Sequence, residues 1–170
     1  MRISMENTSY DEACLSRADR AEQLFRKGFN CSQSVFAAFS DVYGMDEKTA
    51  LKISASFGGG MGRMREVCGC MSAIALAAGL ETGCTTEHDP KGKEYNYKVV
   101  QHLADEFKKI SGGSIICREL LGLDTIRKDG SSPVPSERTN EYYKKRPCIS
   151  LIRDACSIIE KELIGGNKNE

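Results

Sequence analysis

The sequence contains no tryptophan, only two histidines and no excess of charge of either sign. Lysine and arginine together number 24, as do aspartate and glutamate, so no net field attracts nucleic acid or an anionic membrane. The longest apolar run, residues 73–80, is far shorter than the about 18 residues that a membrane-spanning helix needs. We therefore expect neither nucleic acid nor a membrane among the partners of this protein.

A secretory signal is also missing, because residues 1–25 carry charges throughout and contain no apolar stretch. This pattern predicts a cytoplasmic protein, and structural disulfides are rare in that compartment. The residue type in excess is cysteine, with 8 of 170 residues. Cytoplasmic cysteines fill cores, bind metals or act as redox-active thiols, so we look for the function among them.

Apolar residues recur at spacings of three and four along most of the chain, and alternating β-branched runs are absent. This periodicity predicts an all-α fold. At about 150 residues per domain, the length fits one compact domain over residues 1–170, built as a bundle of about six or seven helices. We expect a glycine-rich loop before the central helix, a core over about residues 9–164 and a frayed tail at residues 165–170.

Capping residues and glycines set the expected limits of the helices. The first three expected helices cover residues 9–27, with Ser9 and Glu12 at the start, residues 31–43 after Asn30, and residues 47–56 after Asp46. A fourth covers residues 67–80, and a longer one around residues 99–110 follows Tyr95 and Tyr97. A short helix follows Ser114, and the last begins at about Pro147. Residues 124–146 contain two prolines and no clear period. They are predicted to form a long loop, with the basic segment 142–146 exposed to solvent.

Four cysteines fall at the expected beginnings of helices: Cys31, Cys68, Cys117 and Cys148. Free backbone N–H groups and the positive end of the helix dipole stabilise a thiolate at such a position. Both metal ligation and attack on a disulfide require the thiolate. The alternative is that each cysteine fills space beside a turn as a small apolar side chain.

The other four cysteines have different surroundings. Cys14 and Cys156 lie on the apolar stripes of their expected helices and are interpreted as core residues. Cys70 forms a Cys-x-Cys pair with Cys68, and Cys84 lies in a polar loop four residues before His88. The chain has no Cys-x-x-Cys pair and no Cys-x-x-Cys-His haem attachment site.

Several blocks of the sequence resemble the C_GCAxxG_C_C family of redox-active proteins over about residues 21–163. The blocks are residues 28–35 (GFNCSQSV), 57–63 (FGGGMGR), 66–69 (EVCG), 117–122 (CRELLG) and Cys148. The resemblance implies a small, mostly helical redox protein. Its four signature cysteines correspond to Cys31, Cys68, Cys117 and Cys148, the same four that begin the expected helices. The related domain of split-Soret cytochromes implies that such cysteines can hold an iron–sulfur cluster.

The sequence departs from the family pattern at two positions. The signature Cys-Gly-Ala-x-x-Gly reads here CGCMSA, so that Cys70 replaces the alanine and Ala73 replaces the second glycine. Cys70 therefore adds a thiol beside the expected site, and either Cys68 or Cys70 is a candidate for the working cysteine.

Our first hypothesis is an electron carrier in which the four signature cysteines bind an iron–sulfur cluster of unknown type and exchange electrons with an unidentified redox partner protein. Glycines would let backbone amides approach the cofactor. The residues assigned to that loop are Gly58, Gly59, Gly60, Gly62 and Arg63. This glycine stretch matches neither a dinucleotide fingerprint nor a phosphate-binding P-loop.

Two further hypotheses stay open. The first is a metal-free thiol–disulfide oxidoreductase in which Cys68, activated by Arg63 and Arg65, attacks and Cys70 or Cys31 resolves the intermediate. The second is a structural zinc site formed by Cys68, Cys70, Cys84 and His88. In each case a homodimer is a candidate assembly.

Overall fold

The computed structural model describes residues 15–123 and 132–165, and within these ranges the all-α prediction is confirmed. The described residues contain no strand, only an isolated bridge between Val67 and Ile116. They form eight α-helices, six of them at least seven residues long: α2 (Arg17–Arg26), α3 (Cys31–Ala37), α4 (Glu47–Ser54), α5 (Gly69–Thr82), α6 (Pro90–Ile110), α7 (Cys117–Leu120), α8 (Asn140–Lys145) and α9 (Cys148–Ile158). A 3-10 turn, Ala55–Phe57, follows α4, and a π-helical turn, Ile159–Ile164, extends α9.

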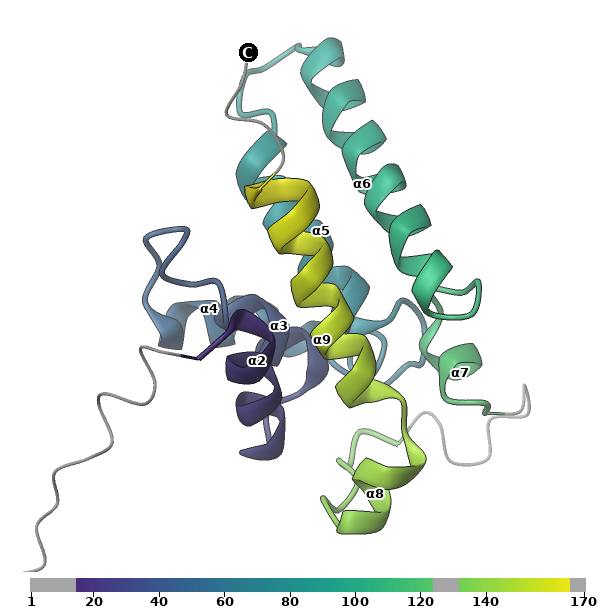
Figure 1. The fold of residues 1–170 in the computed structure, drawn as a ribbon. Helices are drawn as coiled ribbons and strands as arrows, with labels where there is room; N and C mark the ends of the chain where they lie inside the picture. Colours follow the sequence, from purple (N-terminus) through teal and green to yellow (C-terminus); the bar gives the residue numbers. More distant parts are fainter. Residues whose placement is uncertain (1–14, 124–131, 166–170) are drawn as a thin grey trace, which may run out of the picture.

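Helices α3, α5 and α9 form the centre of the molecule. Each packs against the other two, while α2 and α4 cover α3, and α6 covers α5 and α9. In Figure 1 the long helices α5, α6 and α9 rise together, and α7 and α8 lie near their lower ends. The largest side chains of the core are fully buried between these layers: Phe25, Phe39, Ile74, Leu103, Phe107 and Ile152.

Side-chain caps determine where helices α2, α3 and α4 begin. The predicted start of α3 after Asn30 is confirmed, and a capping box forms it: Gln33 N–H donates to Asn30 Oδ1 at 3.0 Å and Asn30 N–H donates to Gln33 Oε1 at 3.1 Å. Asp46 caps α4 in the same way, by accepting from the N–H of Thr49 at 2.9 Å. Helix α2 begins at Arg17 after the N-cap Ser16. The expected start at Ser9, the residue Cys14 and the tail after Gly165 lie outside the described residues.

Three predictions of local structure are wrong. The helix expected over residues 31–43 ends at Ala37, and residues 38–44 form turns. Tyr95 and Tyr97 were expected to precede a helix around residues 99–110, but they lie inside α6. The helix begins earlier because Asp89 caps it and Pro90 occupies its first turn, whereas the apolar spacing in the sequence begins only at Val99. The predicted loop over residues 124–146 contains α8, in which the Thr139 hydroxyl accepts from the N–H of Tyr142 at 3.1 Å. A helix of six residues is too short to display a period.

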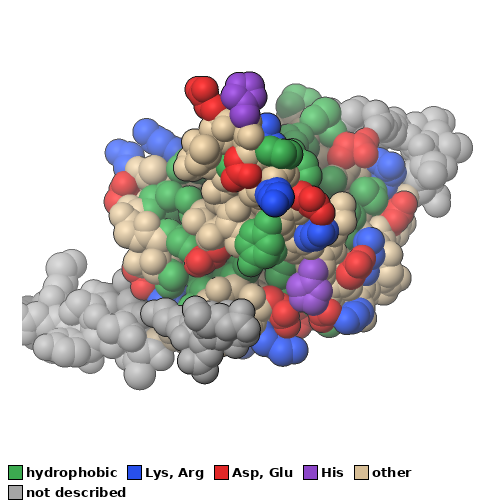
Figure 2. Space-filling model, turned by 90° about the horizontal axis from the view of Figure 1, so that it is seen from above, with side chains coloured by type: hydrophobic (Ala, Val, Ile, Leu, Met, Phe, Trp, Pro, Cys, Tyr) green, Lys and Arg blue, Asp and Glu red, His purple; other side chains and the backbone are tan. Residues whose placement is uncertain are grey.

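None of the helices in residues 15–123 and 132–165 combines the length and the apolar character needed to cross a membrane. The surface seen in Figure 2 intersperses acidic and basic side chains, in agreement with the equal numbers of the two charges.

Candidate functional site

The four signature cysteines begin helices, as predicted. Cys31, Cys117 and Cys148 are the first residues of α3, α7 and α9, and Cys68 is the N-cap residue of α5. Four helix beginnings, well separated in the sequence, therefore each carry a thiol. The first N–H groups of α7 are already used, since those of Cys117 and Arg118 donate to the carbonyls of Glu66 and Arg65.

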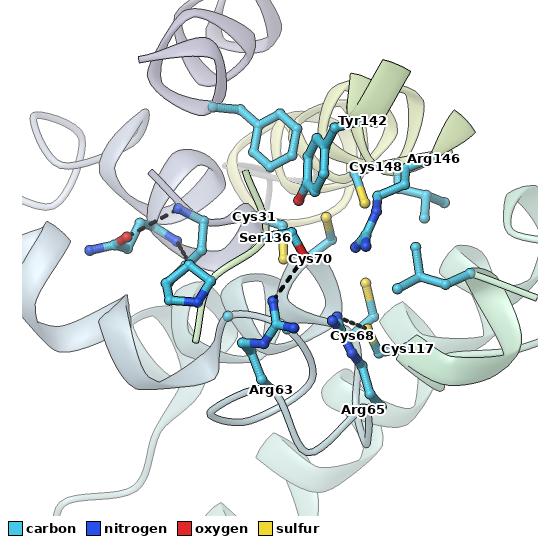
Figure 3. A pocket seen from close by; sticks show the side chains of 18 of the residues that line it. Cys31, Arg63, Arg65, Cys68, Cys70, Cys117, Ser136, Tyr142, Arg146 and Cys148 are labelled. Atoms are coloured by element: carbon cyan, nitrogen blue, oxygen red, sulfur yellow. Dashed lines mark hydrogen bonds between the residues drawn. The ribbon is translucent and has the colours of Figure 1, made fainter. Parts of the chain in front are cut away.

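These four cysteines and Cys70 line a single cavity of about 520 Å³, which we call the five-cysteine cavity. Figure 3 shows their sulfur atoms gathered around its centre, contributed by α3, α5, α7 and α9. Cys84 and Cys156 are free thiols that do not line it. The sulfur atoms are thus collected on one side of the fold.

The glycine-rich loop before α5 brings Cys68 and Cys117 together. Cys117 N–H donates to the carbonyl of Glu66 at 2.6 Å, and Cys68 N–H donates to the carbonyl of Ile115 at 2.7 Å. Gly60 has a φ of +70°, and a Cβ there would lie 2.7 Å from the Cβ of Cys117. This close approach requires glycine.

The glycines expected to surround a cofactor have two different placements. Gly58, Gly59, Gly62 and Arg63 line the cavity, and the backbone N–H of Gly59 reaches the sulfur of Cys31. Gly60 instead lies behind Cys117. The loop therefore supplies both a wall of the cavity and a donor to one sulfur.

Contacts among the thiols give them different pKa values. A hydrogen bond with the Cys70 thiol lowers the pKa of Cys31 to about 6, and the backbone N–H groups of Gly59 and Ser32 act in the same direction. The contacts of Cys70 with Cys31 and Cys68 hold the pKa of the Cys70 thiol well above its ordinary value. Cys70 is therefore the proton-bearing thiol between two neighbours.

Burial raises the pKa of Cys117 to about 11, although Arg65 opposes this shift. Burial also raises the pKa of Cys148 to about 12, and the charges of Cys31, Cys68 and Cys117 add to the effect. The charge on one sulfur therefore raises the pKa of its neighbours, so that each further ionisation in the cavity costs more unless a cation offsets it.

We expect iodoacetamide to alkylate Cys31 of the metal-free protein with a midpoint near pH 6, because the thiolate is the reacting form. Below this pH the rate falls as Cys31 becomes protonated. Peptide mapping by mass spectrometry over a pH series measures the rate of alkylation at Cys31. A rate for Cys31 that still rises steeply above pH 8 would contradict the contact with Cys70.

Arginines surround the sulfur atoms, and among the described residues no aspartate or glutamate lines the cavity. The arginines are Arg63, Arg65, Arg138 and Arg146. Arg65 was expected to activate Cys68, but its Nη1 lies 3.8 Å from the sulfur of Cys117. Arg63 donates to the Ser132 carbonyl and the Ser136 hydroxyl.

The residues of the zinc hypothesis are not brought together. Cys68 and Cys70 lie at the start of α5, whereas Cys84 and His88 follow its end, 14 helical residues or about 20 Å away. Over residues 15–123 and 132–165 no group of three or more Cys, His, Asp or Glu side chains is arranged to hold a single metal ion.

The Gly69→Ala substitution is expected to destabilise the protein by about 1–3 kcal/mol, because it overpacks the site. A Cβ at Gly69 would lie 2.5 Å from the sulfur of Cys31 and 3.1 Å from the carbonyl oxygen of Phe57. Gly79→Ala, ten residues along the same helix, meets nothing within 4 Å and should stabilise by about 0.5–1 kcal/mol. Urea unfolding of both variants measures the difference, and equal stabilities would contradict the contact between α3 and α5.

A family model described as "Putative redox-active protein (C_GCAxxG_C_C)" matches residues 29–162. The chain belongs to this family. Searches of curated proteins and of solved structures gave no match. As a family member, the protein keeps all four signature cysteines on the wall of one cavity.

Part of this wall was missed in the sequence. Arg138 and Tyr142 line the cavity from the segment that was predicted to be a solvated loop. The guanidinium carbon of Arg138 lies 4.5 Å from the ring centre of Phe25 and 4.7 Å from that of Tyr142. The only signal in the sequence was the density of aromatic and basic residues before Pro147, and it carried no information on which way they face.

Proposed function

We propose that the protein is an electron carrier in which Cys31, Cys68, Cys117 and Cys148 hold an iron–sulfur cluster. One observation carries the proposal: four separate helix beginnings place thiols around one cavity without acidic side chains among its described lining residues. Four thiolates are the usual ligand set of such clusters. The donors therefore fit in kind and in number.

The surroundings of the sulfurs also favour a bound, negatively charged group. Backbone N–H groups at the starts of α3 and α9 and the guanidinium group of Arg65 lie beside thiols whose ionisation is otherwise costly. Hydrogen-bond donors near cluster sulfurs raise the reduction potential. When bound, the cluster supplies the capacity to accept and release single electrons. Two of the proposed ligands, Cys68 and Cys117, are each less than one-tenth exposed, so little water would reach them.

Anaerobic purification followed by determination of iron and acid-labile sulfide tests this proposal. We expect both elements, in comparable amounts, together with visible absorption that fades on reduction. A colourless protein that takes up neither element during anaerobic reconstitution with iron and sulfide would overturn it.

A second candidate function is thiol–disulfide exchange through Cys31 and Cys70. It is favoured by the hydrogen-bond contact between these two sulfurs, which needs no metal. In this reaction the two thiols lose two electrons and two protons and form one S–S bond, while a disulfide of the partner is reduced to two thiols. The geometry favours Cys31 over Cys68 as the attacking thiolate, because Gly59 and Ser32 direct N–H groups at its sulfur.

A further inference from the structure

Two arginines of the five-cysteine cavity, Arg65 and Arg138, have more hydrogen-bonding capacity than the described residues use. Arg65 is 7% exposed, yet its Nε is buried and donates no hydrogen bond to the described part of the chain. Nη1 of the same group points at the sulfur of Cys117. A buried donor without a partner is costly, and such atoms often mark the place of a ligand.

Arg138 has the same property on another wall of the cavity. Its Nη2 donates to the carbonyl of Phe29 at 3.2 Å, while its Nη1 is buried and has no acceptor among the described residues. Stacking against Phe25 and Tyr142 fixes the plane of the guanidinium group, so that its position does not depend on an ion pair.

The cavity also has the size and lining of a small-molecule site. Its volume of about 520 Å³ lies within the range of about 300–1,000 Å³ that is usual for ligand pockets. Apolar side chains form part of the remaining walls: Phe25, Leu120, Leu121, Pro133, Pro135 and Leu151. Arg146 stacks on Tyr142 at 4.4 Å, and Figure 3 shows Arg63, Arg65 and Arg146 directed into the same space as the sulfurs.

We propose that the five-cysteine cavity binds a small oxyanion through Arg65 and Arg138, with the anion beside the sulfur atoms. Guanidinium groups pair with the oxygens of sulfate, sulfite and phosphate groups through charge-assisted, commonly bidentate hydrogen bonds. No acidic side chain among the described lining residues would repel the anion. The anion-binding site itself does not depend on the proposed function. Only the exchange of electrons between a bound sulfur oxyanion and the site rests on that function.

Calorimetric titration of the anaerobically purified protein with sulfate, sulfite and phosphate, at an ionic strength matched with chloride, tests this inference. We expect saturable binding of one anion per chain. Arg138→Gln and Arg65→Gln should each weaken it by about tenfold or more, because each removes a charge-assisted donor. Tighter binding of sulfite and sulfate than of phosphate would identify a sulfur oxyanion as the ligand, and the reverse order would identify a phosphate group.

Arg20→Gln is the matched control, because Arg20 pairs with Asp41 and Glu47 and does not line the cavity. It should leave anion binding unchanged. If Arg65→Gln does not fold, Arg138→Gln decides the question alone. Absence of saturable binding of all three anions, or binding that both cavity variants retain, would overturn the inference.

Iron determined in the same samples separates this inference from the proposed function. Anion binding by a protein that takes up no iron would support the oxyanion site and overturn the cluster. Iron without anion binding would support the cluster and overturn the oxyanion site. The arginines would then serve only to offset the charge of the sulfurs.

Discussion

Cys148→Ser is expected to remove most of the iron that we propose the purified protein binds, because serine would replace one of the four proposed thiolate ligands by a hydroxyl that stays protonated at neutral pH. Iron per chain and visible absorption after anaerobic reconstitution measure the loss. The substitution keeps the size of the side chain, and Cys148 is partly exposed. A change in stability of about 1 kcal/mol is therefore expected, too small to explain the loss by unfolding.

Cys84→Ser is the matched control for this experiment. Cys84 is also a free, partly exposed thiol, but it lies near Thr86 and Asp89, away from the five-cysteine cavity. Its replacement should leave the iron content unchanged. If both variants lose iron equally, or both retain it, then Cys148 is not a ligand.

Cys70→Ala is expected to have two opposite effects, depending on the state of the protein. In metal-free protein treated with a disulfide-forming oxidant, we expect wild type to form a disulfide between Cys31 and Cys70 and Cys70→Ala not to form it, because the partner sulfur is gone. In reconstituted protein it should leave the iron content unchanged, since the four signature cysteines remain. Non-reducing peptide mapping and iron analysis measure the two effects.

Cys117→Ala is the comparison for this second experiment. It should lose iron and keep the disulfide, the reverse of Cys70→Ala. The alanine at position 70 is the residue of the family signature, so the variant is expected to fold. Loss of iron from Cys70→Ala would show that Cys70 is a ligand. A disulfide that still forms at Cys31 in the usual amount would show that Cys70 takes no part in disulfide formation.

The sequence predicted those features of the site that depend on short-range interactions. The cap of α3 at Asn30 and Gln33 and the start of α9 at Pro147 depend on neighbouring residues of the chain, so the helix-start positions of Cys31 and Cys148 could be predicted. The family resemblance joined the four cysteines into one set, and the cavity places this set together.

Features that depend on tertiary contacts could not be predicted. Arg63 and Arg65 adopt φ values of 63° and 62°, a conformation that only the folded glycine-rich loop selects for residues with side chains. Arg138 faces the cavity because Phe25 and Tyr142 hold it there, and these residues come from opposite ends of the chain. The same reason applies to the contact of Cys70 with Cys31, since the spacing of two residues in Cys-x-Cys indicated only a pair with Cys68.

Crystallography of the anaerobically purified protein, with anomalous data collected at the iron absorption edge, tests the central claim most directly. The account predicts an iron peak inside the five-cysteine cavity, bonded to the sulfurs of Cys31, Cys68, Cys117 and Cys148. Iron found elsewhere in the molecule, or a cavity without an iron signal in crystals grown from reconstituted protein, would contradict it.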